Sequence, residues 1–225
     1  MTGSKSRYAR SASDCAGIEA ARRAEHTDIE HRAMSGGKVE WHQVKGQESA
    51  KRALEIAVTG YHTIHLYGDV GQAEVLRAAF KDIGGAPERF VPRAEAEIHV
   101  EIFPLDDGDI LIPSLCEPAA AVMERIAQAR AVPAPRATNP VLQTEDGIAM
   151  DYSAMAFRTL LLQNRWFAGN ATVIAMIERV AVTIAAMSVV ATEADRRRQY
   201  KPPAIVSRIH MAEASYYRCH AEALL

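Results

Sequence analysis

The chain has 225 residues, 48% of them hydrophobic, and a formal net charge of −2 at pH 7. A chain of this size and composition buries one ordinary domain, or a core with a small appendage. The near-neutral charge gives no global field that would favour nucleic acid or an acidic membrane surface.

Cysteine usage and hydropathy indicate the compartment. The three cysteines lie far apart, at Cys15, Cys116 and Cys219, and form no Cys-x-x-Cys pair. This pattern is typical of reduced thiols in the cytoplasm rather than of a disulfide framework or a zinc site. We identify no apolar run of about 20 residues that would span a bilayer, and no apolar signal core at the N-terminus. The sequence therefore predicts a soluble cytoplasmic protein without a membrane partner.

Residues 1–38 are rich in Ser, Arg, Ala and Gly and contain almost no large apolar side chains. Such a segment buries too little surface to offset the entropy of ordering the chain, so we expect a mostly disordered tail. Residues 14–32 contain enough Ala, Glu and Arg for a fraying helix. Its arginines are candidates for contact with an anionic partner, with a solvated tail as the alternative: Arg22, Arg23 and Arg32.

A helix is expected over residues 49–58. Its apolar residues recur with the i, i+3, i+4, i+7 spacing of one amphipathic face: Ala50, Ala53, Leu54 and Ala57. The alternating residues 62–67 then predict a strand that enters a turn at Gly68. Residues 74–83 predict the helix behind that turn.

The order helix, strand, glycine turn and helix is that of a P-loop nucleotide-binding domain. A P-loop reads Gly-x-x-x-x-Gly-Lys-Ser/Thr: its backbone N–H groups surround the phosphates, the Lys reaches their outer oxygens, and the hydroxyl holds magnesium. Counted from Gly68, the last three positions hold Ala73, Glu74 and Val75. A carboxylate at the lysine position repels a triphosphate and Val75 cannot bind a metal, so the chemistry of the site is predicted to be lost.

The remainder of the chain is predicted to be one strand followed by helices. Residues 97–103 alternate in hydropathy and indicate the strand. Helices are expected over four further segments: 117–130, 148–164, 170–187 and 209–218. The most periodic is 170–187, whose wide apolar stripe is typical of a packed helix. The Pro-rich residues 132–140 form a connector that is too broken for a helix.

Residues 41–72 resemble the magnesium-chelatase-like AAA+ ATPases, the family of the competence protein ComM. That family carries an aromatic-x-Asp-Val-x-Gly-Gln-x-x-Ala-Lys-Arg-Ala-Leu-Glu-Ile-Ala segment, a buried strand, and then Gly-Pro-Pro-Gly-Ser-Gly-Lys-Thr. Here Trp41 fills the aromatic position, Gln43 replaces Asp, and residues 44–57 follow the pattern closely. The helices expected over residues 117–130, 170–187 and 209–218 also resemble family helices. Because the resemblance begins near Met34, a start-site artefact is an alternative for the residues before it.

The resemblance implies that parts of the ATPase are missing. In the family, a long interval with the Walker B acids separates the P-loop helix from a strand reading Asp-Ile-His-Val-Glu-Val-Pro. Here the similar residues 97–102 follow shortly after Gly85, so the Walker B region is expected to be deleted. The family's sensor-2 arginine falls on Thr172. We therefore predict an α/β fold: a reduced P-loop (AAA+-like) remnant with a small sheet over residues 39–112, then an all-α C-terminal lid over residues 113–225.

The resemblance also implies a vestigial nucleotide site. Adenine-side contacts fall on Val44 and Gly46, whose alternative role is packing of the helix against the strand. The phosphate turn falls on five consecutive residues: Gly68, Asp69, Val70, Gly71 and Gln72. Backbone N–H groups remain there, but Asp69 and Glu74 oppose an anion. No catalytic residue or metal ligand is predicted, and ATP with magnesium is expected to be at most vestigial.

Two other groups of residues suggest ligands. His99 is flanked on its strand face by Glu97 and Glu101, which indicates either a weak cation site or a solvated cross-strand face. The basic cluster Arg196, Arg197 and Arg198 is a candidate for contact with DNA, because the parent family acts on branched DNA, and a solvated loop is the alternative. Ser, Cys and His are scattered without a legible nucleophile–base pair.

Three functional hypotheses follow. The first is a catalytically inactive magnesium-chelatase/ComM-like AAA+ homologue that acts as an interaction protein and docks with itself or with an active full-length AAA+ ring. ATPase activity is not expected, because Glu74, Thr172 and the deleted Walker B region remove three independent elements. The second is a weakly ATP-binding factor in DNA processing or recombination. The third is a decayed gene product without a selected function, which the sequence does not separate from the first.

Overall fold

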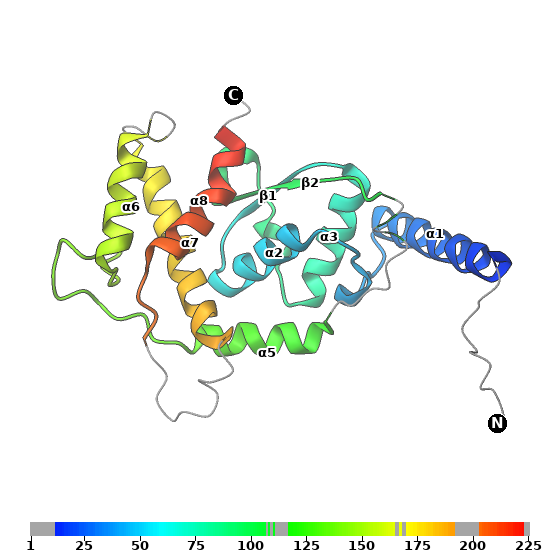
Figure 1. Cartoon of the computed structure of the whole chain (residues 1–225), viewed down its shortest axis with the longest axis horizontal. Coiled ribbons are helices and arrows are strands. Elements are labelled where there is room, and N and C mark those ends of the chain that lie inside the picture. Colours follow the sequence, from blue (N-terminus) through cyan, green and yellow to red (C-terminus); the bar gives the residue numbers. More distant parts are fainter. Residues whose placement is uncertain are drawn as a thin grey trace, which may run out of the picture.

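The computed structural model describes residues 12–106, 108, 110, 117–164, 167, 170–191 and 203–222. Figure 1 shows a mixed α/β part that carries α1 at one end of the molecule, and a helical part with α6 at the other end. The elements follow in chain order: α1 (Ala12–Met34), the 3₁₀ turn η1 (Trp41–Gln43), α2 (Glu48–Gly60), β1 (Ile64–Gly68), α3 (Val70–Asp82), the 3₁₀ turns η2 (Pro87–Arg89) and η3 (Arg93–Glu95), β2 (Ile98–Ile102), α5 (Ala119–Arg130), α6 (Tyr152–Gln163), α7 (Ala171–Ala191) and α8 (Arg208–Glu222).

The sheet has two parallel strands, β1 and β2, joined through α3. Within the described ranges, its further pairing is an isolated bridge between Ile64 and Phe90. Successive side chains of a strand point to opposite faces, so one face carries the buried aliphatic residues of both strands and the other carries polar ones. α2 and α8 contact β2, and α3 contacts β1. A mixed α/β fold with a small sheet is therefore confirmed.

Most predicted elements are present, and two helices begin four residues away from the expected start. α6 begins at Tyr152 rather than near Ile148, because residues 148–150 form isolated bridges to other segments and Asp151 caps the helix by accepting a hydrogen bond from Ala154 N at 2.8 Å. α3 begins at Val70, earlier than the predicted 74–83. The second difference changes the candidate site.

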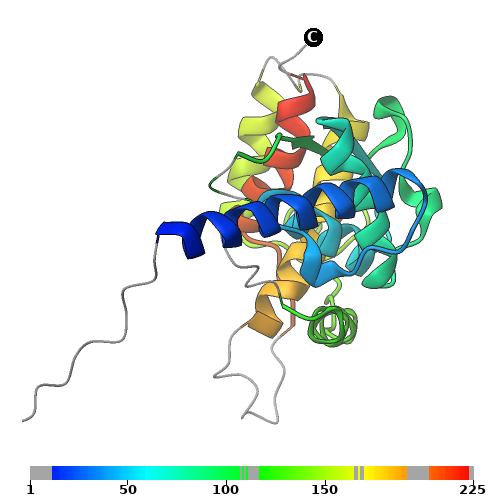
Figure 2. The ribbon, with the colours of Figure 1, turned by 90° about the vertical axis from the view of Figure 1, so that its right-hand side faces the viewer.

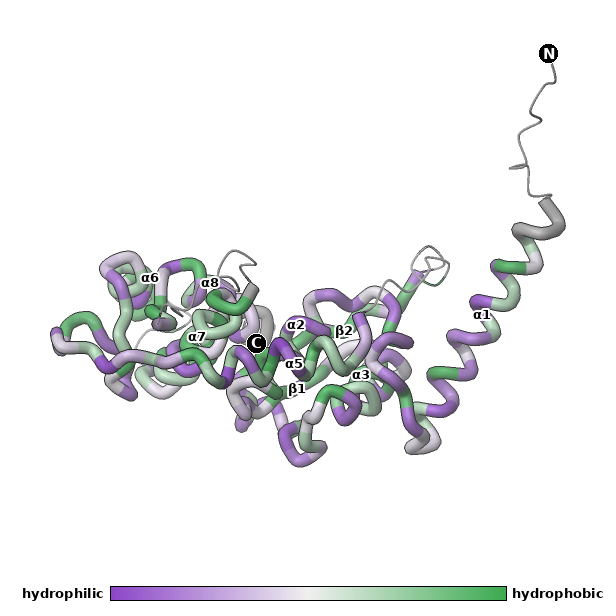
Figure 3. The backbone as a smooth tube through the Cα atoms, turned by 90° about the horizontal axis from the view of Figure 1, so that it is seen from below, coloured by the Kyte–Doolittle hydropathy of each residue, from purple (hydrophilic) through white to green (hydrophobic). Residues whose placement is uncertain are grey.

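Residues 1–38 were expected to be mostly disordered, with a fraying helix over residues 14–32, and the part of this segment that the structure describes is largely helical. Residues 12–34 form α1, and its second half packs on α3 by burying His26, Ile29 and Ala33. The expectation considered only the residues of the segment itself. In the structure, Ile29 is buried because α3 packs against it. The first half of α1 carries mostly exposed residues and projects from the body of the protein (Figures 2 and 3). Residues 1–11 lie outside the described ranges.

α7 corrects the expectation that no apolar run is long enough to span a bilayer. Its stretch Ala171–Val190 meets that criterion by length and composition, although more than half of it is buried inside the protein. The adjacent charged residues Glu178 and Arg179 interrupt the apolar run in the sequence, so the run was not identified. Glu178 is 1% exposed and pairs with Arg158, Nε to Oε1, at 2.8 Å. A core helix meets the same criterion as a membrane span, and here the stretch packs on α5 and α8.

One continuous hydrophobic core connects the α/β part to the helical part. α2 lies at its centre, because it contacts β2 and α3 on one side and α5 and α7 on the other. The predicted boundary between residues 112 and 113 falls outside the described residues. The two parts nevertheless pack against each other through α2.

Candidate functional site

The turn after β1 is tight. β1 ends at Gly68 and α3 begins at Val70, so Asp69 alone separates the strand from the helix. Gly68 has a φ of +106°, and a Cβ there would lie 2.2 Å from Ile102 O, so only glycine fits. Asp69 N donates to the same carbonyl at 2.9 Å. A P-loop places several residues between strand and helix to surround a phosphate, and here those residues belong to α3.

Asp69 caps the amino end of α3. Its Oδ1 accepts a hydrogen bond from Gln72 N at 2.8 Å, the usual N-cap arrangement. A carboxylate at this helix end occupies the position that favours a phosphate at other helix N-termini. This geometry supports the expectation that Asp69 opposes an anion.

The second half of α1 covers the same turn. Gln72 is 2% exposed, and its Nε2 donates to Glu30 Oε1 at 2.5 Å and lies 3.2 Å from His26 Nε2. A Cβ on Gly71 would lie 3.1 Å from Glu30 Oε1, so this second carboxylate rests against the turn. Sequence reasoning missed His26 and Glu30 because they belong to residues 14–32, which were expected to form only a fraying helix in a mostly disordered tail. Their i, i+4 spacing beside the apolar Ile29 was the available signal.

A triphosphate does not fit these residues. Asp69 and Glu30 place two carboxylates at the turn, and Glu74, at the lysine position, pairs with Arg77 Nε at 3.4 Å along α3. Thr172, at the sensor-arginine position, is exposed in the first turn of α7. Figure 1 shows α7 on the opposite side of α2 from α1. The hydroxyl that would hold magnesium is replaced by Val75, which is buried.

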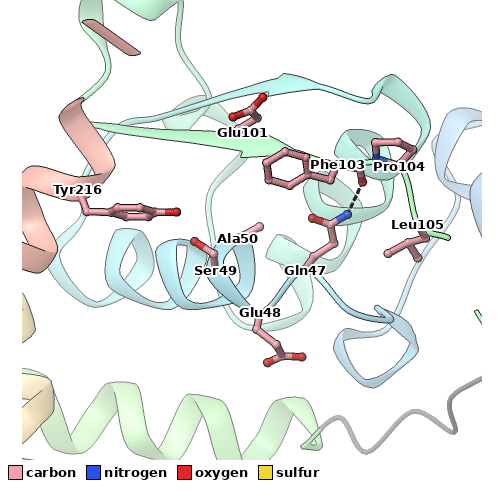
Figure 4. A pocket seen from close by; sticks show the side chains of 9 residues that line it. All are labelled: Gln47, Glu48, Ser49, Ala50, Glu101, Phe103, Pro104, Leu105 and Tyr216. Carbon is pink, nitrogen blue, oxygen red and sulfur yellow. Dashed lines mark hydrogen bonds between the residues drawn. The ribbon is translucent and has the colours of Figure 1, made fainter. Parts of the chain in front are cut away.

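Val44 and Gly46 lie in the connection from η1 to α2. Val44 is fully buried in the core, which favours the packing role over contact with adenine. Gly46 has a φ of +56°, and this left-handed residue turns the chain into α2. The first turn of α2 borders a cleft of about 280 Å³ together with the end of β2 and Tyr216 of α8 (Figure 4). Within it, Gln47 Nε2 donates to Phe103 O.

A hydroxyl, an imidazole and a carboxylate lie in line between the sheet and α7. His62 Nε2 is 2.8 Å from Thr183 Oγ1, and His62 Nδ1 is 3.2 Å from Glu97 Oε2. Hydrolase triads use the same order of groups. Here Thr183 and His62 are both buried, and the cleft of Figure 4 is lined by other residues. We therefore interpret the group as a packing network.

This network keeps Glu97 ionised. Burial pushes the pKa of Glu97 upward, but the hydrogen bond and charge of His62, the Thr63 amide and Arg179 together lower that pKa below its ordinary value. Arg179 of α7 forms an ion pair with Glu97. The network thus ties the start of β2 to α7. The sequence contains no local signal for it, because His62 and Thr183 are 121 residues apart.

The other candidate ligand residues have different outcomes. Arg196, Arg197 and Arg198 lie outside the described residues, so contact with DNA stays a prediction. His99 is buried, and its Nε2 lies 2.7 Å from Arg218 Nη1, so a guanidinium occupies the position that a cation would need. Among the residues that the structure describes, no group of three or more His, Cys, Asp or Glu is placed to hold a metal ion.

The described elements define a mixed α/β protein with a two-stranded parallel sheet and a helical C-terminal part, which is consistent with a reduced P-loop-like fold. The family model described as magnesium chelatase, subunit ChlI, matches residues 40–82. This segment spans η1, α2, β1 and α3, which is less than half of the chain, and supports a likeness to magnesium-chelatase-like AAA+ proteins. No curated protein and no solved structure matches the chain.

Proposed function

We propose that this protein is a catalytically inactive relative of the magnesium-chelatase-like AAA+ proteins, of ComM type, that acts in the cytoplasm by binding another protein. The partner is a second copy of the chain or an active AAA+ ring. The observation that carries the proposal is the turn from Gly68 to Gln72, which two carboxylates close. The similarity over residues 40–82 supports a likeness to the AAA+ fold. The two carboxylates at the turn argue against nucleotide hydrolysis.

Electrostatics disfavours nucleotide turnover. Removing one preorganised electrostatic element typically costs about 2.7–4 kcal/mol of transition-state stabilisation. Here the lysine position holds Glu74, the sensor position holds Thr172, and the path from β1 to β2 contains α3 and two 3₁₀ turns without a further strand. Phosphoryl transfer depends on positioning and charge stabilisation, so these changes together leave no basis for turnover.

The helical part is held against the α/β part by partly buried polar contacts. Arg125 Nη2 pairs with Glu55 of α2 at 2.6 Å, and Arg130 Nε donates to Thr59 O at 3.2 Å. The network of His62 and Thr183 adds a third connection. A nucleotide-driven motor moves its domains by hinge or shear closure. Contacts of this kind favour a rigid binding scaffold over a moving lid.

An exposed apolar patch on the helical part supports protein binding. Tyr152 is 69% exposed at the start of α6, and Ile209 is 75% exposed at the start of α8. Arg208 N donates to Ser153 Oγ at 3.1 Å, which brings the two helix starts together. Ile205, in the segment before α8, is also exposed. We call Tyr152, Ile205 and Ile209 the α6–α8 patch, and large apolar side chains exposed in one region are typical of an interaction site.

Calorimetry with a non-hydrolysable ATP analogue and magnesium tests the loss of nucleotide binding. We expect no binding by the parent chain, and none by Glu74→Lys, because that substitution restores the charge but leaves Asp69 and Glu30 at the turn. The proposal would be contradicted if the purified protein released phosphate from ATP and a substitution that disrupts the Gly68 turn abolished that release.

Co-purification with a full-length AAA+ relative, and light scattering for self-association, test the partner. Ile209→Ser is expected to weaken the complex, with Met123→Ser as a matched control because Met123 is exposed on α5, away from the patch. Elution as a monomer that leaves the relative's ATPase rate unchanged would count against an interaction role.

A further inference from the structure

The polar face of the sheet carries buried donors without partners. In the parallel register His65 lies opposite His99 and Tyr67 lies opposite Glu101, so these four side chains share a face. The ring centroid of His65 is 6.2 Å from that of Tyr67 and 6.0 Å from that of His99. Three buried polar atoms in this region have no hydrogen-bond partner within the described part of the chain: Tyr67 Oη, Arg93 Nη2 and His99 Nδ1.

All three atoms are hydrogen-bond donors. Arg218 Nη1 lies 2.7 Å from His99 Nε2, closer than Ala96 O, which lies 3.2 Å from that nitrogen and itself accepts a hydrogen bond from Arg218 Nη1. Because a guanidinium only donates, that imidazole nitrogen accepts, and the proton of the neutral ring resides on Nδ1. Tyr67 donates through its hydroxyl and Arg93 through its guanidinium. A buried donor without an acceptor is costly, so three of them in one region indicate an acceptor that comes from outside the chain.

The surrounding charges favour a negatively charged acceptor. Arg93 acts electrostatically on both Tyr67 and His99, so it lies near both. Burial, and next the charge of Arg218, lower the pKa of His99 to about 4, so this imidazole is neutral at pH 7. The remaining groups that act on Tyr67 or His99 are His65, Glu101 and Tyr216. Two guanidiniums against one carboxylate leave the region net positive.

We propose that this face binds a small oxyanion, with Arg93, Tyr67 and His99 as its donors. A phosphate or a carboxylate has the required chemistry, since charged acceptors form the stronger hydrogen bonds with such donors. The cleft of Figure 4 offers the approach, because Glu101 and Tyr216 line it and also act on Tyr67. The proposed donors lie on and beside the polar strand face rather than among the residues after Gly68, and the proposal does not depend on the proposed function.

Calorimetric titration of the full chain with inorganic phosphate, sulfate and acetate near pH 7 tests the proposal. Arg93→Gln is expected to weaken binding about tenfold or more, because it removes a charge-assisted hydrogen bond. Tyr67→Phe removes one donor without changing charge and is expected to weaken binding less. Glu101→Gln removes the opposing carboxylate and is expected to tighten binding. Arg89→Gln is the control, since Arg89 bonds Tyr61 O instead.

Proton NMR of the His99 ring provides a second readout. An anion at the site is expected to raise the pKa of His99, whereas ions bound elsewhere leave it unchanged. Binding of phosphate and sulfate alone indicates a phosphate-like ligand, and binding of acetate alone indicates a carboxylate. Circular dichroism checks that each variant is folded. If Arg93→Gln does not fold, the comparison of Tyr67→Phe with the parent chain tests the proposal instead. No binding, or binding that Arg93→Gln and Glu101→Gln leave unchanged (an adventitious ion only), overturns the proposal.

Discussion

The imidazole of His62, just before β1, lies 2.8 Å from the hydroxyl of Thr183 in the middle of α7. Both side chains are buried. Through this contact the helical part is bonded directly to the start of the sheet. Substitutions at Thr183 and at the neighbouring Gly60 are therefore expected to change the stability of the protein.

Thr183→Val removes the hydroxyl while it keeps the shape of the side chain. His62 then loses a buried partner, and we expect the free energy of unfolding to fall by about 1–3 kcal/mol. Chemical denaturation monitored by circular dichroism measures the change. Thr172→Val, at an exposed position of the same helix, is expected to change stability by less than about 0.5 kcal/mol. Equal effects of the two variants would contradict the role of the network.

Gly60→Ala is expected to destabilise the protein even though alanine favours helices. A Cβ at Gly60 would lie 2.2 Å from His62 Nε2 and 2.3 Å from Thr183 Oγ1, so it would push the two side chains apart. We expect a loss of about 1–3 kcal/mol, measured by thermal unfolding. Gly17→Ala in α1 is the control: nothing lies within 4 Å of its Cβ position, and a gain of about 0.5–1 kcal/mol is expected. A stabilised Gly60→Ala variant would show that the clash is absent.

Stability is expected to fall as the pH falls from 6.5 to 4. Burial and Arg218 lower the pKa of folded His99 to about 4, while the ordinary value of 6.5 applies to the unfolded chain. In this window the unfolded state binds a proton that the folded state does not, so protonation favours unfolding, by about 3 kcal/mol at most. The lowered pKa values of Glu97 and His210 act in the same sense, and the raised pKa of Glu178 acts oppositely.

His99→Gln isolates this contribution, because glutamine accepts the Arg218 hydrogen bond but does not titrate. Urea unfolding at a series of pH values is expected to give a flatter pH dependence for the variant than for the parent chain. Identical slopes would exclude His99 as a source of the acid sensitivity.

Glu30→Ala is expected to loosen α1 from α3. Gln72 Nε2 then loses its carboxylate acceptor, and leaving a buried donor unpaired costs about 1–3 kcal/mol. Hydrogen exchange over residues 12–34 is expected to accelerate. Glu19→Ala, at an exposed position in the projecting half of α1, serves as the control. Unchanged exchange in both variants would mean that Glu30 does not anchor the helix.

Short-range patterns were sufficient for the frame of this protein. The amphipathic period of α2, the alternation in β1 and β2 and the apolar stripe of α7 each depend on neighbouring residues, so they can be read along the chain. Gly68 was also recognised as a turn residue, and the structure adds that a Cβ there would meet Ile102 O. The replacement of the P-loop lysine by Glu74 could likewise be identified by counting positions from Gly68.

The state of the candidate site was decided by tertiary contacts. Residues 14–32 were expected to form at most a fraying helix in a mostly disordered tail, because their own side chains bury little, and the packing of α1 on α3 brings Glu30 to the turn. The contacts of His62 with Thr183 and of His99 with Arg218 join residues that are distant along the chain. The periodicities of strands and helices, 2 and 3.6 residues, do not predict these contacts, because the contacts depend on how whole helices and strands pack together.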